Sequence, residues 1–249
     1  MKLEDKIKSF DLRTELENKE EGKNRDEKLV LVFKDLARLI LQGYFLVKKN
    51  NCDSFVKVQP TCVEIYCHEE GEGDDKIKDY IVYHRNKDNG EDLKSLFPLG
   101  VLHNHVSGID ITFEHGKDAA QAVRLSALIR EFSVDESHKN EEQLSELDKV
   151  KIIDKPTYLY DALYSQYSVF EGGFSIQWVD GSEETVFEIS EEQRCNVAEY
   201  ELKEKMDKNK SYESPEKKTM AEHPDAQPTA NKKYVQDMRM WRFKRSSKK

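Results

Sequence analysis

The sequence has no run of about 18 apolar residues, which a membrane-spanning helix requires, so we expect no membrane segment. Its first 28 residues are charged and contain no apolar stretch of the kind that marks a secretory signal. There are only four cysteines in 249 residues and none forms a CxxC pair, which excludes a disulfide framework. No internal repeat is present. These absences predict a cytoplasmic protein, and we expect a monomer.

Charge is abundant but unevenly distributed along the chain. Charged residues make up 36% of the sequence and hydrophobic residues 37%, with a formal net charge of −9, which argues mildly against a nucleic-acid partner. The last eighteen residues reverse this balance, because they carry eight Lys or Arg against one Asp. Such a basic, aromatic-containing end is either a phosphate-contacting element or a solvated tail.

Composition divides the chain into four segments. Residues 1–27 predict a charged lead that is either a frayed helix or partly disordered, and residues 28–202 carry the patterns of one α/β (α+β) domain. Residues 203–231 are rich in Lys, Glu, Pro and Ser with almost no apolar side chains, so we expect a disordered polar insertion. Residues 232–249 predict a basic C-terminal strand and tail.

Within the domain, apolar spacing predicts a helix from Leu29 to Leu41 that ends at Gly43. Residues 119–129 fit either a helix or a buried strand, and the acidic residues 134–150 fit a surface helix or loop. A second helix is expected over 157–166 after Pro156. A turn at Asp180-Gly181 predicts a β-hairpin of 174–179 with 185–189. Further strands are expected at 44–47, 55–58, 61–67, 99–105, 109–113 and 234–243.

Glu64 is the first candidate catalytic residue. Alternation places Glu64 and Tyr66 on one face of their strand, and Val63, Ile65 and Cys67 on the other. A carboxylate flanked by apolar residues on a strand is partly desolvated, which raises its pKa and suits it to general-base chemistry. The alternative is an edge-strand carboxylate that faces water, as most strand carboxylates do.

The segment from residue 100 to residue 115 concentrates polar side chains. His103 and His105 share one face of the expected strand, and Asp110 and Glu114 follow closely. Two imidazoles with a later carboxylate form a workable donor set for Zn²⁺ or Fe²⁺. The alternative is that these groups form hydrogen bonds around the Ser107-Gly108 loop.

Arg130 lies inside an apolar run, where an arginine either pairs with a carboxylate in a structural ion pair or reaches toward a site. Tyr66, Tyr83 and His84 offer rings that could stack on an extruded base, although aromatic residues at strand spacing more often belong to a core. His84 precedes a turn, so exposure to solvent is the alternative for it.

The order of these segments resembles that of the alkyladenine (3-methyladenine) DNA glycosylases. The helix and strand Leu36–Val47 resemble that family's opening "LAxxLLGxxLV", and Val63–Tyr66 resembles its "VExEAY" strand. Five further segments match in the same order, so that the resemblance spans roughly residues 28–245; they are 84–86, 99–112, 128–130, 157–163 and 241–243.

The resemblance implies a single domain with a curved, mostly antiparallel sheet and peripheral helices. It also implies a base-excision repair hydrolase that cleaves the N-glycosidic bond of alkylated purines, needs no cofactor, and binds double-stranded DNA with a flipped damaged base. In this family the Glu that aligns with Glu64 activates water, and the Arg that aligns with Arg130 helps to orient the water and the base. Tyr66 and His84 align with the stacking residues.

The remaining site residues also follow from the resemblance. Asn104 and Glu114 fall at positions that line the base pocket, where the family has a Tyr and an Asn. Ser107 and Gly108 fall at the hairpin tip, and Arg242, Lys244 and Arg245 fall in the DNA-contacting C-terminal segment. Ser107 replaces the Tyr that wedges into the duplex, which removes about 1–3 kcal/mol of stacking.

Two other functions compete with this one. The first is a fold relative with altered chemistry, a metal-dependent or nucleotide-directed hydrolase built around His103, His105, Asp110 and Glu114. The second is a non-catalytic interaction protein that uses its charged ends for partners. It predicts that Glu64 is exposed to solvent.

Overall fold

The computed structural model describes most of the expected domain. The described residues are 1–49, 55–73, 75–79, 82, 84–86, 93–138, 152–164, 167–168, 170, 173–182, 187–194, 197–198, 234–235 and 239–246. The insertion expected at 203–231 and the stacking candidate Tyr83 lie outside these residues. No helix in this part of the chain is both long and apolar enough to cross a membrane.

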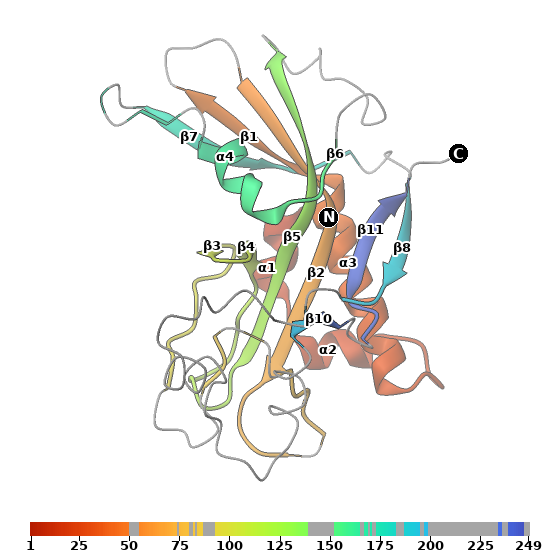
Figure 1. The fold of residues 1–249 in the computed structure, drawn as a ribbon. Coiled ribbons are helices and arrows are strands. Elements are labelled where there is room, and N and C mark those ends of the chain that lie inside the picture. Colours follow the sequence, from red (N-terminus) through yellow and green to blue (C-terminus); the bar gives the residue numbers. More distant parts are fainter. Residues whose placement is uncertain are drawn as a thin grey trace.

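Helices come mainly from the first 42 residues, and strands dominate the rest of the described chain (Figure 1). The helical elements are α1 (Leu3–Ser9), α2 (Leu12–Glu17), α3 (Arg25–Gln42), the 3-10 turn η3 (Pro156–Tyr158) and α4 (Leu159–Tyr164). The strands are β1 (Tyr44–Lys49), β2 (Phe55–Glu69), β3 (Leu102–His105), β4 (Gly108–Thr112), β5 (Val123–His138), β6 (Ile152–Ile153), β7 (Phe174–Val179), β8 (Glu188–Glu192), β9 (Val197–Ala198), β10 (Tyr234–Val235) and β11 (Arg242–Ser246).

The helix predicted near residue 29 is confirmed as α3, which starts earlier because Asn24 and Glu27 form a reciprocal capping box at its N-terminus. Its apolar residues recur at three- and four-residue spacing and form one buried stripe that packs on the sheet. Gly43 ends the helix, and an added Cβ there would lie 2.2 Å from the Trp178 ring. The chain therefore passes directly from α3 into β1.

Of the two alternatives for residues 1–27, the structure shows helix over most of residues 3–17 and corrects the disordered one there. These residues form α1 and α2, and the apolar side chains Leu3, Ile7, Phe10 and Leu12, in and between these helices, belong to the core. Four apolar residues in a highly charged segment are enough to anchor it, because each helix needs only one buried stripe. The remaining charges lie on the solvent side or in ion pairs such as Lys6 with Glu15.

β2 is the organising strand of the sheet. The strands expected at 55–58 and 61–67 merge into this one 15-residue strand, which pairs with β5 along nearly its whole length. Its other edge is shared, because β1 pairs near Val58 and β11 pairs around Val63. Pro60 sits where the register shifts, as expected for a proline inside a sheet. The result is a mixed α/β fold with a curled antiparallel sheet, in the order β3-β4-β5-β2-β1-β7, with β11 paired to β2 and β8 paired to β11.

One ambiguity about β-structure is resolved and two expectations are corrected. The strand alternative for residues 119–129 holds from Val123, where β5 begins, and β5 continues to His138 through residues expected as a surface helix or loop. The hairpin of 174–179 with 185–189 does not form, because β7 pairs with β1 and β8 pairs with β11. The turn residues have other partners: Asp180 accepts from the Leu3 amide, and Gly181 packs against the Gln42 backbone.

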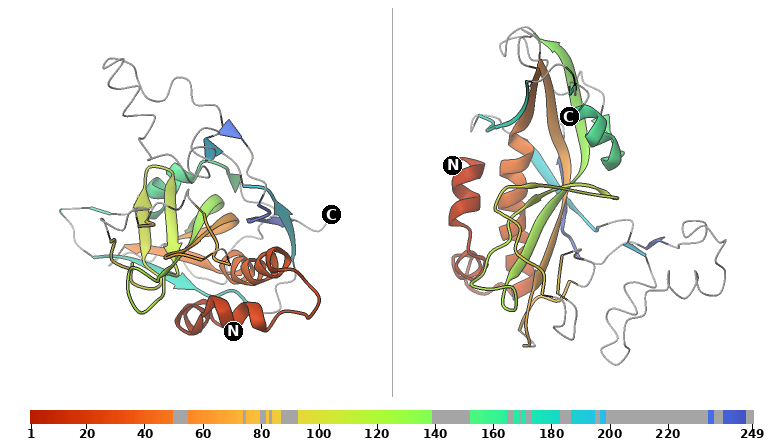
Figure 2. Two further views of the ribbon diagram at one scale, coloured as in Figure 1. Left: turned by 90° about the horizontal axis from the view of Figure 1, so that it is seen from below. Right: turned by 90° about the vertical axis from the view of Figure 1, so that its left-hand side faces the viewer.

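The two faces of the sheet differ in chemistry and in what covers them. Figure 2 shows α1, α2 and α3 on one face and α4 on the opposite side. Residues at alternate positions face the helices and form the apolar core; on the three strands that matter most they are Val63, Ile65, Cys67, Ile109, Ile111, Phe113, Leu125, Ala127 and Ile129. The intervening residues are polar and face the other way.

Candidate functional site

The intervening residues of β2, β4 and β5 form a polar face that is largely buried. Lateral pairing aligns Asp110, Leu128 and Glu64 in one row across the three strands. We define the polar face by the residues on this side of the sheet; they are His103, His105, Asp110, Thr112, Glu114, Arg124, Ser126, Leu128, Arg130, Glu64, Tyr66 and His68. Because buried ionisable groups destabilise a fold unless they are paired, and strongly perturbed groups gather at functional sites, we take the polar face as the candidate site.

Glu64 lies at the centre of this face and is 0% exposed. Its Oε2 accepts a hydrogen bond from the Tyr66 hydroxyl at 2.9 Å and lies 3.2 Å from Arg130 Nε. Arg242 Nη1 lies 3.9 Å from Oε1. The exposed, water-facing carboxylate of the alternative interpretation is therefore wrong, and the predicted alternation of β2 is confirmed.

Arg130 lies beside Glu64 at a β-bulge. Cys62 pairs with Glu131 and Val63 pairs with Ile129, so Arg130 is the extra residue of β5 at this point. Bulges of this kind redirect a side chain and are common beside active sites. Arg130 therefore forms the ion pair with a carboxylate that one of its two interpretations predicted, and its role in a site stays a prediction.

Tyr66 is held between Glu64 and a cation. Burial raises the pKa of the Tyr66 phenol well above its ordinary value, and the neighbouring Glu64 carboxylate adds to this effect, so the phenol stays protonated and donates. The Arg194 guanidinium lies 4.7 Å from the Tyr66 ring centroid. Arg194 is itself fixed by Asp79, which also binds Arg239.

A second buried network surrounds Arg124, which is 0% exposed. Its guanidinium lies 3.1 Å from both Glu70 and Glu114 and donates to Asn86. Glu114 in turn contacts His84 Nδ1 at 3.3 Å. The structure thus brings His84 and Glu114 together, and both are buried, so the exposed alternative for His84 is wrong.

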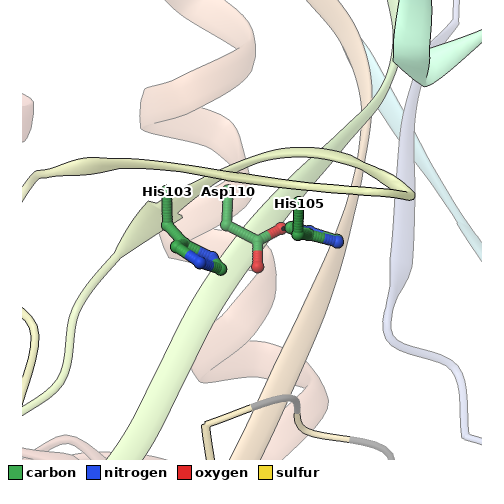
Figure 3. A group of neighbouring side chains, drawn as sticks. All are labelled: His103, His105 and Asp110. Carbon is green, nitrogen blue, oxygen red and sulfur yellow. Dashed lines mark ion pairs between the residues drawn. The ribbon is translucent and has the colours of Figure 1, made fainter.

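The β3–β4 hairpin carries a third polar cluster, which His84 joins to the second. His84 Nε2 lies 3.4 Å from His103 Nε2, and the His103 and His105 rings are stacked with centroids 5.4 Å apart. His105 Nε2 lies 3.2 Å from Asp110 Oδ1. Burial lowers the pKa of His103, and the adjacent His84 adds to the effect. Figure 3 shows His103, His105 and Asp110 on the same side of the hairpin.

The hairpin tip differs from the expected arrangement. Ser107 is exposed, but Gly108 is buried, because a Cβ added there would lie 2.9 Å from Pro156. The tip presents Val106, which is 90% exposed. Asn104 is exposed and alternates with His103 and His105, so it points away from the polar face and does not line a site with His84.

Arg242 and Lys244, which belong to the described part of the basic C-terminus, are both paired with carboxylates. Arg242 contacts Glu131 and Glu192 besides Glu64, and Lys244 contacts Glu131. The Arg245 guanidinium lies 4.4 Å from the Phe187 ring centroid. The strand expected at 234–243 is confirmed only at its end, because β11 begins at Arg242 and continues to Ser246, whereas Tyr234 and Val235 pair with β9 and residues 236–238 lie outside the described part of the chain.

Sequence reasoning missed the residues that support the site from a distance. Arg124 and Ser126 share the alternation that leads to Arg130, so a polar residue at every second position of an apolar run was a detectable signal. Asp79 and Arg194 gave no comparable signal, because their pairing joins segments 115 residues apart. Val106 gave no signal either, because single exposed apolar residues are common on protein surfaces.

The arrangement can hold a carboxylate in a dry environment beside a proton donor and a guanidinium, and it offers a separate set of imidazole and carboxylate donors. Comparisons of the chain with protein-family models, with curated proteins and with solved structures find no match. The chemistry of the polar face therefore carries the functional argument.

Proposed function

We propose that this chain is a base-excision hydrolase that cleaves the N-glycosidic bond of alkylated purines in double-stranded DNA, with Glu64 as its general base. The observation that carries the proposal is the environment of Glu64, which is fully buried between the Tyr66 hydroxyl and the Arg130 guanidinium. The motif order that resembles the alkyladenine DNA glycosylases supports the choice of substrate.

The reaction needs one base and one leaving group. Glu64 takes a proton from a water molecule, and the water oxygen forms a bond to C1′ of the extruded nucleotide. The bond between C1′ and the purine nitrogen breaks, and its electron pair leaves with the base. Alkylation of the purine ring makes the base a better leaving group, so general-base catalysis by one carboxylate, worth about 10²–10⁴-fold, is matched to the task.

Tyr66 and Arg130, the neighbours of Glu64, have different supporting roles. Tyr66 donates to Oε2 and fixes the carboxylate orientation, while Arg130 approaches the same oxygen and balances its charge. Oε1 lies 3.9 Å from Arg242 Nη1, and in the proposed reaction it accepts the proton that the water molecule loses. Tyr66 and His84 supply ring surfaces for the extruded base, and the Val106–Ser107 tip enters the duplex at the vacated position.

The direct test is release of free base from a duplex oligonucleotide that contains one alkylated purine, measured as strand cleavage at the abasic site after alkali. The wild-type chain releases the base, and Glu64→Gln reduces the rate by at least about 100-fold. Binding to the same duplex is measured at low salt, because an acidic chain has weak long-range attraction for phosphate.

Glu131→Gln is the matched control. Glu131 is another buried glutamate next to the same Arg242, but it lies outside the proposed reaction. Its variant retains base release, and melting curves for both variants separate a loss of catalysis from a loss of fold. Failure of the wild-type chain to bind duplex and to release base would overturn the proposal.

A further inference from the structure

The β3–β4 hairpin carries a donor cluster that the proposed glycosidic reaction does not use. His103 and His105 come from alternate positions of β3, and Asp110 lies directly across the hairpin from His103. Alternation and cross-strand pairing therefore place all three side chains on the polar face, as Figure 3 shows.

The three side chains converge. Each offers one ligand atom, and these atoms all lie within 4.8 Å of one another. The two imidazole rings are nearly parallel, with an interplanar angle of 15°, and His105 Nε2 lies 3.2 Å from Asp110 Oδ1. Donor atoms bound to one transition-metal ion at about 2.0–2.2 Å are separated by distances of this order.

The surroundings hold the cluster in place. Ser126 Oγ donates to the other carboxylate oxygen, Asp110 Oδ2, at 3.1 Å. His84 Nε2 contacts His103, while His84 Nδ1 contacts Glu114. The Tyr160 hydroxyl donates to the backbone carbonyls of His105 and Gly108, which fixes the hairpin against the rest of the domain. Such outer contacts orient metal ligands and tune their affinity.

We propose that His103, His105 and Asp110 bind one divalent transition-metal ion of the Zn²⁺ or Fe²⁺ type. Two imidazole nitrogens and one carboxylate favour such an ion over Mg²⁺ or Ca²⁺, which prefer all-oxygen sites. Three protein ligands leave coordination positions for water or a substrate group. The competing explanation is an ordinary imidazole–carboxylate pair between His105 and Asp110 that binds no ion.

The site lies near Glu64 but is separate from it. Asp110 and Glu64 are in the same cross-strand row with Leu128 between them, and two strand spacings amount to roughly 10 Å. An ion bound at the hairpin would thus share the polar face with Glu64 without replacing any of its contacts. Metal binding and base release can therefore succeed or fail independently.

The test uses the full chain purified without a polyhistidine tag, stripped with chelator and titrated with Zn²⁺ or with Co²⁺ as a spectroscopic probe. We expect one equivalent of metal per chain, cobalt d–d absorption typical of nitrogen and oxygen ligands, and a rise in melting temperature of roughly 5 °C at saturating metal. Ser126→Ala weakens binding by roughly tenfold, as loss of an outer contact does.

The ligand variants are His105→Gln and Asp110→Asn, which keep side-chain size. Each lowers metal affinity by at least roughly 100-fold and abolishes the melting-temperature shift, whereas the control His115→Gln, outside the cluster, retains both. Binding of less than about 0.1 equivalent by the wild-type chain, or equal binding by wild type and both ligand variants, overturns the proposal.

Discussion

Arg130 is the residue that a bulge adds to β5, and its Nε lies 3.2 Å from Glu64 Oε2 on β2. The alternation of β5 places Arg130 on the same face as Leu128, which pairs with Glu64. The bulge lies at this point of the strand, and the guanidinium faces the fully buried carboxylate. The pairing of these two residues explains how the fold tolerates a charge at the centre of its sheet.

The first prediction concerns this pair. Arg130→Met leaves Glu64 buried with one cation fewer, so the free energy of unfolding falls by about 3–5 kcal/mol. Glu64→Gln relieves the unpaired charge, so the double variant is less destabilised than the sum of the two single variants. Urea denaturation of the four proteins gives the coupling, and strictly additive effects would show that the two side chains do not interact.

The second prediction concerns Asp79. Burial alone would raise its pKa, but Arg194 and Arg239 outweigh burial and lower the pKa below its ordinary value. A lowered pKa in the folded state stabilises the protein above about pH 4, and this stabilisation is lost as the pH falls through the folded-state pKa. Asp79→Asn should cost about 3–5 kcal/mol at pH 7, because two buried cations lose their partner.

The pH dependence provides the check. The difference in unfolding free energy between wild type and Asp79→Asn shrinks as the pH falls below about 5, because Asp79 of the unfolded wild-type chain takes up a proton at a higher pH than Asp79 of the folded protein does. Asp5→Asn, on the exposed side of α1, serves as the control and shows little change. A difference between wild type and Asp79→Asn that stays constant over this range would contradict the assigned role of Asp79.

The third prediction concerns Cys62, whose pKa burial raises to about 12 despite the opposing effect of Arg242. A thiol in this state is almost fully protonated and inaccessible, so iodoacetamide does not label it in the native protein at pH 8. Peptide mapping after labelling, with and without denaturant, follows Cys62 individually. Native-state labelling at the rate of a free thiol would show that β2 is not buried there.

The fourth prediction concerns the hairpin tip. Val106 is 90% exposed, and burial of a valine side chain contributes about 1.5 kcal/mol or more. If the tip enters duplex DNA, Val106→Ser weakens binding by about tenfold without changing the melting temperature of the protein. Val101→Ser, at an exposed valine away from the tip, is the matched control. Equal duplex affinity for wild type, Val106→Ser and Val101→Ser would show that the hairpin tip does not contact the DNA.

The local features of this fold were predicted correctly from the spacing of apolar and polar residues. Three- and four-residue spacing predicted α3, and alternation correctly separated Glu64 and Tyr66 from the core side of β2. These features depend on near neighbours in the chain, which is why they can be read without a structure. Near neighbours alone did not decide between helix and strand for residues 119–129. The pairing of β5 with β2, a contact between distant parts of the chain, decides for a strand.

Features that depend on distant pairing were missed. The Asp180-Gly181 turn suggested a hairpin, but β7 pairs with β1, and β8 pairs with β11. The bulge at Arg130 arises only from the register between β2 and β5, and the Asp79–Arg194 pair joins segments far apart in sequence. Asn104 was assigned by motif position alone, and the alternation of β3 turns it away from the polar face.

The central claim is that the buried carboxylate of Glu64 activates water for N-glycosidic hydrolysis. The most direct measurement is the single-turnover rate of base release from a duplex containing one alkylated purine, compared between wild type, Glu64→Gln and Glu131→Gln. The account predicts release by wild type and Glu131→Gln and a loss of at least about 100-fold in Glu64→Gln. Equal rates for wild type and a folded Glu64→Gln variant, or no release by any of them, would contradict it.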